Sequence, residues 1–447
     1  MNKALIWLLS NDKEKSMKVE ILRITVKGFR NITEAEIKLD DLTAIVGLNG
    51  YGKSNVITAI DFGIDFIRLS PKKNKMADKA AIPLLRNFAG MDYSFEIEAK
   101  IGNYIIQYGF TFAWETSLSK SRIKDEHLFM KSATSHGRYS AYIIRRTELF
   151  GEYRSSEKGR CTNEIRVDKD ELVLNKLVNY DDLFYHDILH GISEIHFYIE
   201  KHLDANPSYA LRSIGNDSFD PFFNIPSTVW RLKQEHKELY SILIDSFQKL
   251  FPFVDSVECF QIPLTKGTDN IVHDNLYLLT IQDKRLTQPI SFSGLSDGTK
   301  RVFLSLTFAV LAQIKELSAM VIEEPENSIH PSLLQVYLRI LNDLSGDCKI
   351  IITSHSPYII QYLPPENIYI GLCHESGQVD LRRIIKPALV NANAAKLNQS
   401  LGDYLFNCIS FSNANEIMAD FLEKPAPGII QEEESEDDEW LNGSDDA

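Results

Sequence analysis

A glycine-rich segment near the amino end carries the first residues able to do chemistry. It runs Gly47-Leu48-Asn49-Gly50-Tyr51-Gly52-Lys53-Ser54 and matches the pattern G-x-x-x-x-G-K-S. Glycines let a backbone wrap closely around phosphate groups, and the inward N–H groups of such a loop bind anions. In this pattern Lys53 reaches the β- and γ-phosphates of a nucleotide, and the Ser54 hydroxyl ligates Mg²⁺. The segment therefore predicts a site for ATP with Mg²⁺.

Two adjacent acids close an apolar run much further along the chain, in Met320-Val321-Ile322-Glu323-Glu324-Pro325. At the end of a buried strand, Glu323 can hold Mg²⁺ directly or through water, and Glu324 can polarise the water that attacks the γ-phosphate. A glutamate pair at a strand end is often only a solvated surface. A phosphate-binding loop in the same chain favours the catalytic interpretation.

Two further segments suit contacts with a γ-phosphate. Ser296 and Gly298 lie in Leu295-Ser296-Asp297-Gly298-Thr299, just before a helical pattern, where backbone N–H groups bind anions. As a lone match, Ser296 would be a simple helix cap, but its place about twenty-five residues before the two acids favours a function. The run Ile350-Ile351-Ile352-Thr353-Ser354 suits a buried strand and is followed by His355, whose ring could donate a hydrogen bond to the γ-phosphate or to the attacking water. A lone histidine is more often structural, but its place after the two acids favours a function.

These residues need a sheet and helices to position them. Residues 42–46 suit a buried strand before the glycine-rich loop, and isoleucines recur at helical spacing after it, so a helix N-terminus faces the phosphates. Residues 93–113 alternate as strands of an antiparallel sheet with one buried face. Residues 170–250 show mainly helical spacing without the heptads of a long coiled coil. The predicted fold class is an α/β P-loop NTPase with an antiparallel β subdomain and an inserted, mainly helical region.

The same patterns divide the chain into five parts. We expect an N-terminal extension (1–16), a first ATPase lobe (17–165), a helical insertion (166–253), a second lobe with C-terminal helices (254–424), and a disordered acidic tail (425–447).

The four motifs, in this order, resemble the ABC-type ATPase heads of the SMC and RecF proteins over about residues 17–371. Lys27-Gly28-Phe29-Arg30-Asn31-Ile32 looks like the opening segment of that group. The run Glu323 to Pro331, EEPENSIHP, is similar to the block E-P-E-N-x-x-H-P of the overcoming-lysogenisation-defect (OLD) ATPases and related bacterial AAA-like proteins. The resemblance implies an ABC-ATPase head that forms a dimer around ATP.

Roles carried over by position follow from that resemblance. ATP and Mg²⁺ would be bound by Gly47, Asn49, Gly50, Gly52, Lys53, Ser54 and Asn55, with Glu323 completing the metal site. Glu324 would be the general base and His355 the switch histidine; Ser296 and Gly298 would complete the opposite protomer's site, and His330 would lie between protomers. Two residues depart from the family pattern: Glu323 replaces the usual aspartate, and Asp297 replaces a common glycine. Gln107 is a weak candidate for the Q-loop glutamine.

Composition limits the class of protein. The chain has 447 residues, 44% of them apolar and 25% charged, and no apolar run of the ~20 residues that cross a bilayer. Its five scattered cysteines indicate reduced thiols, so we expect a cytoplasmic protein. The net charge is −14, but nine acidic residues lie in 431–447, which leaves about −5 for the rest. That balance neither indicates nor excludes nucleic-acid binding.

Three functions fit a dimerising ATPase. The first is a sensing or scaffolding ATPase of a bacterial anti-phage defence system, with an effector on a separate chain. The second is a RecF/SMC-like DNA repair or maintenance ATPase, to which the basic stretches 68–79, 120–124 and 145–146 could contribute. The third, a transporter nucleotide-binding domain, is disfavoured because 243 residues separate Lys53 from Ser296. In the acidic tail, Trp440-Leu441 could dock a partner, although a solubilising tail is more common.

Overall fold

The computed structural model describes residues 17–68, 91–114, 122–134, 137–199, 209–211, 225–264, 274–327, 329–374, 376–411 and 413–424. The N-terminal extension (1–16), most of the basic stretch 68–79, and the acidic tail (425–447) with Trp440-Leu441 lie outside these ranges, so the predictions made for them are not addressed by the structure.

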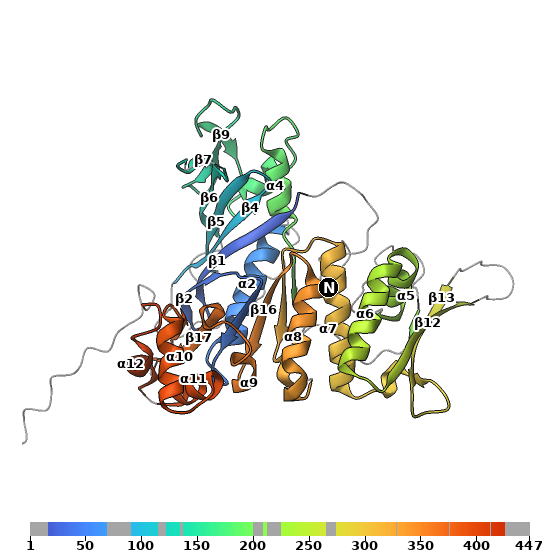
Figure 1. The fold of residues 1–447 in the computed structure, drawn as a ribbon. Coiled ribbons are helices and arrows are strands. Elements are labelled where there is room, and N and C mark those ends of the chain that lie inside the picture. The colour runs from blue at the N-terminus through green and yellow to red at the C-terminus, as the bar shows by residue number, and fades with distance from the viewer. Residues whose placement is uncertain are drawn as a thin grey trace, which may run out of the picture.

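One long sheet of fourteen strands dominates the described residues (Figure 1). Its order is β10-β15-β16-β3-β17-β18-β2-β1-β4-β5-β6-β7-β8-β9. The neighbours from β10 to β17 pair in parallel, and those from β1 to β9 pair antiparallel. The parallel part comprises β10 (Phe197–Ile199), β15 (Ala319–Glu323), β16 (Lys349–Ser354), β3 (Leu42–Val46) and β17 (Ile368–Cys373). The remaining strands are β18 (Val379–Arg383), β2 (Ile32–Lys38), β1 (Val19–Phe29), β4 (Tyr93–Ile101), β5 (Tyr104–Ala113), β6 (Arg122–Ser132), β7 (Ser140–Arg145), β8 (Phe150–Tyr153) and β9 (Asn163–Arg166).

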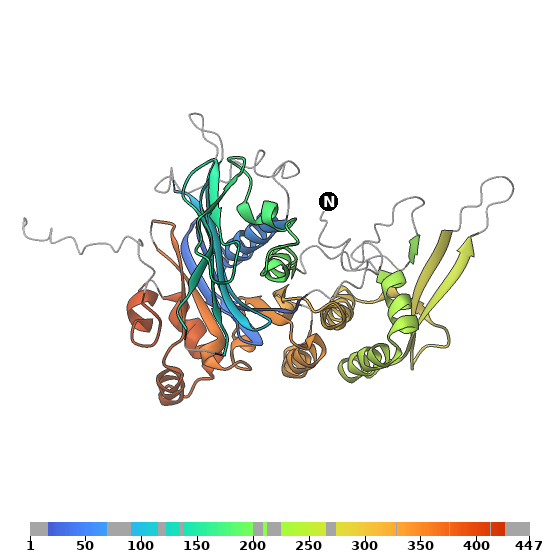
Figure 2. The ribbon, with the colours of Figure 1, turned by 90° about the horizontal axis from the view of Figure 1, so that it is seen from above.

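Helices cover both faces of the parallel part, which explains the continuous apolar runs of its strands. Alternate residues of β3 belong to different cores: Ala44 and Val46 to one, Ile45 to the other. The view from above shows α2 and the helices after β9 on one side of the sheet and the C-terminal helices on the other (Figure 2). The first group is α2 (Lys53–Arg68), α3 (Val173–Leu177) and α4 (His186–Ser193). The core that contains Ala44 and Val46 also contains residues of α7 (Asp297–Ile314), α8 (Pro331–Ser345), α9 (Pro357–Ile360), α10 (Pro387–Lys396), α11 (Leu401–Ser410) and α12 (Ala414–Met418).

A smaller sheet leads into the Ser296 segment. It has the order β11-β13-β12, with β14 paired to β13. Its strands are β11 (Tyr209–Leu211), β12 (Val254–Leu264), β13 (Asp274–Asp283) and β14 (Ile290–Ser291), and it packs against α5 (Ile225–Glu235) and α6 (Lys237–Leu250). After β14, the short 3₁₀ helix η4 (Phe292–Gly294) delivers the chain to the start of α7.

The region 166–253, expected to be mainly helical, also contributes a strand to the main sheet. β10 pairs in parallel with β15, so Phe197 lies opposite Ala319. The reason is the run Phe197-Tyr198-Ile199, whose three side chains are all buried and fill the sheet edge beside β15. A short apolar run inside helical segments cannot be told from a helix by its spacing.

The antiparallel lobe is held together by two buried charged side chains. Glu126 on β6 is fully buried and accepts hydrogen bonds from the Val173 and Leu174 N–H groups at the start of α3, at 2.6 and 2.9 Å. Burial raises the pKa of Glu126, and these N–H groups oppose that rise. Arg145, also fully buried, donates to backbone carbonyls of the neighbouring loops, among them Thr147 and Asp168 at 3.0 and 3.1 Å. These contacts connect the strands to the helices.

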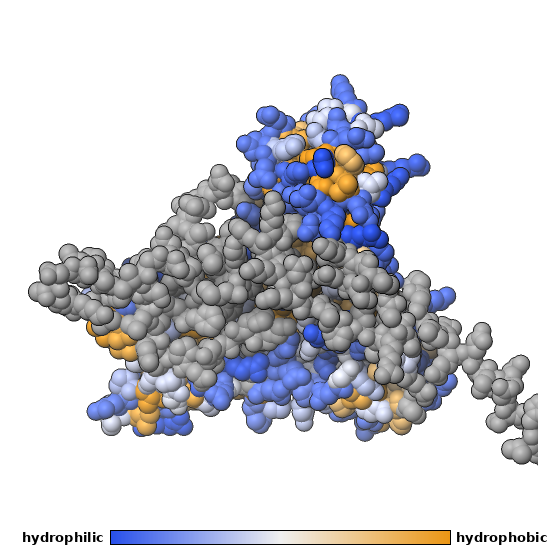
Figure 3. Space-filling view, turned by 180° about the vertical axis from the view of Figure 1, so that it is seen from behind, coloured by the Kyte–Doolittle hydropathy of each residue, from blue (hydrophilic) through white to orange (hydrophobic). Residues whose placement is uncertain are grey.

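Large apolar side chains are exposed on the antiparallel lobe. Seen from behind, apolar side chains show on the upper lobe (Figure 3). The exposed large apolar residues of that lobe include Leu149, Phe150, Tyr180 and Phe184.

All five cysteines lie in described segments and are free thiols, as predicted. None of the helices in the described segments combines the length and apolar character that crossing a bilayer requires.

Candidate functional site

The glycine-rich loop joins β3 to α2 as the sequence predicts. Gly50 and Gly52 adopt φ of +84° and +74°, a region that favours glycine, and a Cβ on Gly52 would come within 2.7 Å of the Val379 side chain. The Gly47 N–H donates to the Ser354 carbonyl on β16 at 3.3 Å. Gly50, Asn49 and Ser54 are exposed, so the loop is open to solvent above the carboxyl ends of the strands.

Lys53 is buried beneath this loop, with 7% of its surface exposed. Its Nζ donates to the carbonyls of Gly47 and Leu48 at 2.8 and 3.0 Å. Burial lowers the pKa of Lys53, while the nearby carboxylates of Glu324 and Glu326 act in the opposite direction. The ammonium group therefore lies between the loop and the acids that follow β15.

Asn55, one residue after Ser54, is tied to the turn between β1 and β2. The Arg30 Nη1 donates to Asn55 Oδ1 at 2.8 Å, and Asn55 Nδ2 donates to Asn31 Oδ1 at 2.7 Å. The Phe-Arg-Asn segment thus holds the start of α2 in place. A direct contact of Asn55 with nucleotide stays a prediction.

The two acids differ in their surroundings. Glu323 ends β15, and its Oε1 is buried without a hydrogen-bond partner in the described structure, which suits an oxygen that ligates a cation. Glu324 has φ +48°, uncommon for a residue other than glycine, and its N–H donates to the Thr353 carbonyl at 2.9 Å. This left-handed residue turns the chain away from the sheet immediately after Glu323.

Glu324 and His355 lie side by side at the ends of neighbouring strands. Glu324 Oε1 lies 3.0 Å from His355 Nδ1, although the two atoms are not aligned as a hydrogen bond. The other oxygen, Oε2, accepts a hydrogen bond from Asn327 Nδ2 at 2.9 Å. Both side chains are about one-third exposed, at 35%. The pair is thus oriented by the protein yet accessible to water.

Glu326 is a residue that the motif analysis left without a role. Its side chain is 7% exposed, and its Oε1 accepts hydrogen bonds from the Ser354 hydroxyl at 2.6 Å and the His355 N–H at 3.2 Å. The Pro-Glu-Asn run of the block E-P-E-N was the only signal for it in the sequence.

Ser296, Gly298 and His330 lie at the starts of α7 and α8. Ser296 is exposed and caps α7, accepting from the Thr299 N–H at 3.2 Å, as the simpler interpretation of this serine has it. His330 is exposed and caps α8 through the Ser332 N–H at 3.2 Å. In the described residues, no hydrogen bond or ion pair of Ser296 or His330 reaches the glycine-rich loop.

Two other predicted positions can be placed. Asp297, beside Ser296, has an 87% exposed side chain paired with Lys300 Nζ at 2.8 Å, which partly offsets its charge. Gln107 lies in the middle of β5 between Glu98 and Phe129, in the antiparallel lobe.

Of the basic residues described in these stretches, Arg122, Lys124 and Arg145 are paired or buried, whereas Arg146 is exposed. Arg145 is buried and bonded to carbonyls, so it cannot reach a nucleic acid. Arg122 pairs with Glu148, and Lys124 pairs with Asp92 at 2.6 Å.

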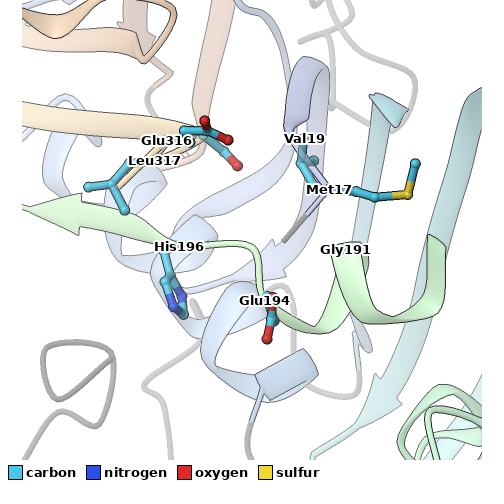
Figure 4. A pocket seen from close by; sticks show the side chains of 8 residues that line it. Met17, Val19, Gly191, Glu194, His196, Glu316 and Leu317 are labelled. Carbon is cyan, nitrogen blue, oxygen red and sulfur yellow. The ribbon is translucent and has the colours of Figure 1, made fainter. Parts of the chain in front are cut away.

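A separate hollow opens beside the amino end of β15 (Figure 4). His196, Glu194, Glu316 and Ser318 are among its lining residues, and its volume of about 10 Å³ suits one water molecule. Because Glu323 ends the same strand, this hollow lies at the opposite edge of the parallel sheet from the acids.

Residues 42–361 match the family described as "AAA domain, putative AbiEii toxin, Type IV TA system". The chain belongs to this AAA domain family. The matched span contains the glycine-rich loop, Ser296, both acids and His355. The predicted resemblance to OLD-like and bacterial AAA-like ATPases and the predicted fold class are confirmed.

One curated relative is an OLD nuclease of Thermus scotoductus (strain ATCC 700910 / SA-01). It is 22% identical over 354 residues, which is 75% of this chain and 58% of the relative. This chain therefore spans less than two thirds of the length of that relative.

Solved structures with a remote likeness include an SMC head bound to the C-winged helix domain of ScpA (14% identity, 83% of this chain and 99% of that chain, TM-score 0.44). Another is the SMC head domain from Thermotoga maritima (14% identity, 82% and 99%, TM-score 0.37). These TM-scores are low, and nothing about function follows from them.

Proposed function

We propose that the protein hydrolyses ATP, with Glu324 accepting the proton of the water that attacks the γ-phosphate. The observation that carries this proposal is the meeting of Glu324 and His355, 3.0 Å apart at the ends of neighbouring strands, next to the loop that contains Lys53. Asn327 fixes one oxygen of Glu324 and leaves the other toward His355. A carboxylate that is held and still accessible to water suits a general base.

The nucleotide would be held by the glycine-rich loop. Backbone N–H groups of this loop and of the α2 N-terminus would bind the phosphates, and Lys53 would exchange its two carbonyl contacts for phosphate oxygens. Ser54 and the unpaired oxygen of Glu323 would hold Mg²⁺, which neutralises phosphate charge when bound. Glu323 is one methylene longer than the usual aspartate, so we expect slower hydrolysis than with aspartate.

ATP would be shared between two copies of the chain. The loop is open to solvent at Asn49 and Ser54, and Ser296 is exposed at the N-terminus of α7. Docking of the Ser296 segment of one copy over the loop of the other would supply the remaining γ-phosphate contacts. Binding of ATP would then favour association and hydrolysis would favour separation.

Mixing two inactive variants tests this arrangement. Lys53→Ala removes nucleotide binding, and Ser296→Asp keeps the helix cap while placing a negative charge against the γ-phosphate. A mixed dimer has one intact site, so the mixture should recover about one quarter of wild-type phosphate release at equal amounts. A mixture as inactive as its components would place Ser296 and Lys53 in the same site of a single copy and contradict the shared site.

We propose further that the dimer signals to a separate effector in an anti-phage defence system. The support is the family description, which names a toxin, and the OLD nuclease among the relatives. Exposed apolar side chains on the antiparallel lobe, such as Phe150 and Phe184, offer contact surface for such a partner. Pull-down from the native host with Glu324→Gln, read by mass spectrometry, should enrich a neighbouring gene product only when ATP is present.

A further inference from the structure

The ends of β15 and β16 are joined beyond the point where their backbone pairing stops. The last paired residues are Glu323 and Thr353, and one more backbone hydrogen bond follows, from the Glu324 N–H to the Thr353 carbonyl. After that the chain leaves β15 in the 3₁₀ helix η5 (Pro325–Asn327). Here the Glu326 carboxylate connects the two strand ends, because its Oε1 accepts hydrogen bonds from both the Ser354 hydroxyl and the His355 N–H. A side chain thus continues the connection that the sheet provides up to Thr353.

Burying the Glu326 carboxylate costs free energy. Only 7% of the Glu326 side chain is exposed, and its second oxygen, Oε2, is buried without a hydrogen-bond partner in the described structure. A buried carboxylate with an unpaired oxygen is unfavourable unless another group compensates. The nearby Lys53 ammonium offers one such compensation, because the charge of Glu326 acts to raise the pKa of Lys53. The two hydrogen bonds from Ser354 and His355 offer another.

We propose that Glu326 is a positioning residue for ATP hydrolysis, which fixes the backbone of Ser354 and His355 so that the His355 ring stays beside Glu324. The inference rests on the proposed ATPase function and adds a residue to it. Glu326 Oε1 lies 3.8 Å from His355 Nδ1, so it touches the turn that carries the ring rather than bonding to the ring itself. The ring is then free to face Glu324 at 3.0 Å.

The consequence for catalysis is specific. Glu326 touches neither the glycine-rich loop nor the Ser54 hydroxyl through any hydrogen bond in the described residues, so its loss should leave nucleotide affinity nearly unchanged. Releasing the His355 backbone would let the ring drift from Glu324, and displacement of a catalytic group by ~1 Å can cost about a hundredfold in rate. The expected signature is therefore a lower kcat with an unchanged Kd for ATP.

Three variants of the full-length chain test this. Glu326→Ala removes both hydrogen bonds and should lower kcat by about 10- to 100-fold, with the ATP Kd within about threefold of wild type. Glu326→Gln keeps an oxygen that can accept both bonds and should retain kcat within about threefold of wild type. Glu366→Ala is the matched control, since Glu366 lies in the same tripeptide, Pro-Glu-Asn, and is exposed; its kcat and Kd should equal those of wild type.

The outcomes separate the explanations. A normal kcat in Glu326→Ala would overturn the proposal, and so would a Glu326→Gln variant as slow as Glu326→Ala, because charge rather than hydrogen bonding would then be the cause. A wild-type protein without ATP turnover would instead refute the proposed function itself.

A milder change keeps the test decisive if Glu326→Ala does not fold. Ser354→Ala deletes the 2.6 Å hydrogen bond to Glu326 and also the bond that the Ser354 hydroxyl accepts from the Ser356 N–H at 3.0 Å, and it leaves the bond from the His355 N–H in place. It should lower kcat about three- to tenfold with unchanged ATP affinity, as expected for one of two positioning bonds. A folded Ser354→Ala protein with wild-type kcat would contradict the role of Glu326.

Discussion

The chain contains the tripeptide Pro-Glu-Asn twice, and both copies form a 3₁₀ helix: η5 (Pro325–Asn327) and η6 (Pro365–Asn367). In the first, Glu326 is buried against the end of β16, and Asn327 donates to Glu324 Oε2 at 2.9 Å. In the second, Glu366 is exposed, and Asn367 donates to the Leu42 carbonyl at 3.2 Å. The same residues therefore hold the proposed general base in one place and a strand backbone in the other.

The difference lies in the edge of the sheet that each turn occupies. η5 follows β15, so it lies at the carboxyl edge of the parallel strands, where the glycine-rich loop and His355 also lie. η6 precedes β17 and contacts Leu42, the first residue of β3, at the amino edge. Ligands of open α/β sheets bind at the carboxyl edge. The tripeptide forms the same turn twice, and only the first turn lies beside the residues proposed to act in hydrolysis.

The largest expected effect concerns the residue just before each turn. Glu324→Gln keeps the shape and the contact with Asn327 but removes the base, so turnover should fall about 10²–10⁴-fold while ATP still binds. The position before the second turn is Pro364, and Pro364→Ala should leave turnover unchanged. Steady-state phosphate release and nucleotide binding measure both. Wild-type turnover in Glu324→Gln would show that the base has been assigned wrongly.

Smaller effects are expected from the two asparagines, one on kcat and the other on the free energy of unfolding. Asn327→Ala frees Glu324 Oε2 and should lower kcat about tenfold, with little change in stability because Asn327 is exposed. Asn367→Ala loses the bond to the Leu42 carbonyl and should lower the free energy of unfolding by about 1 kcal/mol, with normal kcat. Urea unfolding and kinetics on both variants give the comparison. If both asparagines affected the same quantity, the two turns would not differ in role.

Much of the site could be predicted because its residues follow parallel strands. The runs before Gly47, Glu323 and His355 are all apolar, and parallel strands bring their carboxyl ends to one edge. The contact of Glu324 with His355 follows from that arrangement. The antiparallel strands over 93–113 could also be predicted, because apolar and polar residues alternate along them.

Other features depend on contacts that no local pattern encodes. Glu326 has the same neighbours in sequence as Glu366, so only the packing against Ser354 distinguishes the two. Arg145 carries a charge typical of a surface, yet it is buried because the carbonyls of nearby Thr147 and of Asp168, 23 residues away in sequence, accept its hydrogen bonds. β10 is three residues long and lies among helices, so its spacing could not reveal a strand.

The smallest expected effect is a pH dependence that again separates the two turns. Burial lowers the pKa of Lys53, and the charges of Glu324 and Glu326 counteract this because a nearby negative charge favours the ammonium form. Glu326→Gln removes one of these charges, so the pKa of Lys53 should fall further. Nucleotide binding needs the ammonium, and its loss on the alkaline side should therefore begin at lower pH in Glu326→Gln than in wild type, with little difference at neutral pH. Glu366→Gln, altered in the exposed turn, should titrate like wild type. Binding of a fluorescent ATP analogue across an alkaline pH series measures the shift, and an unchanged profile in Glu326→Gln would show that its charge does not act on Lys53.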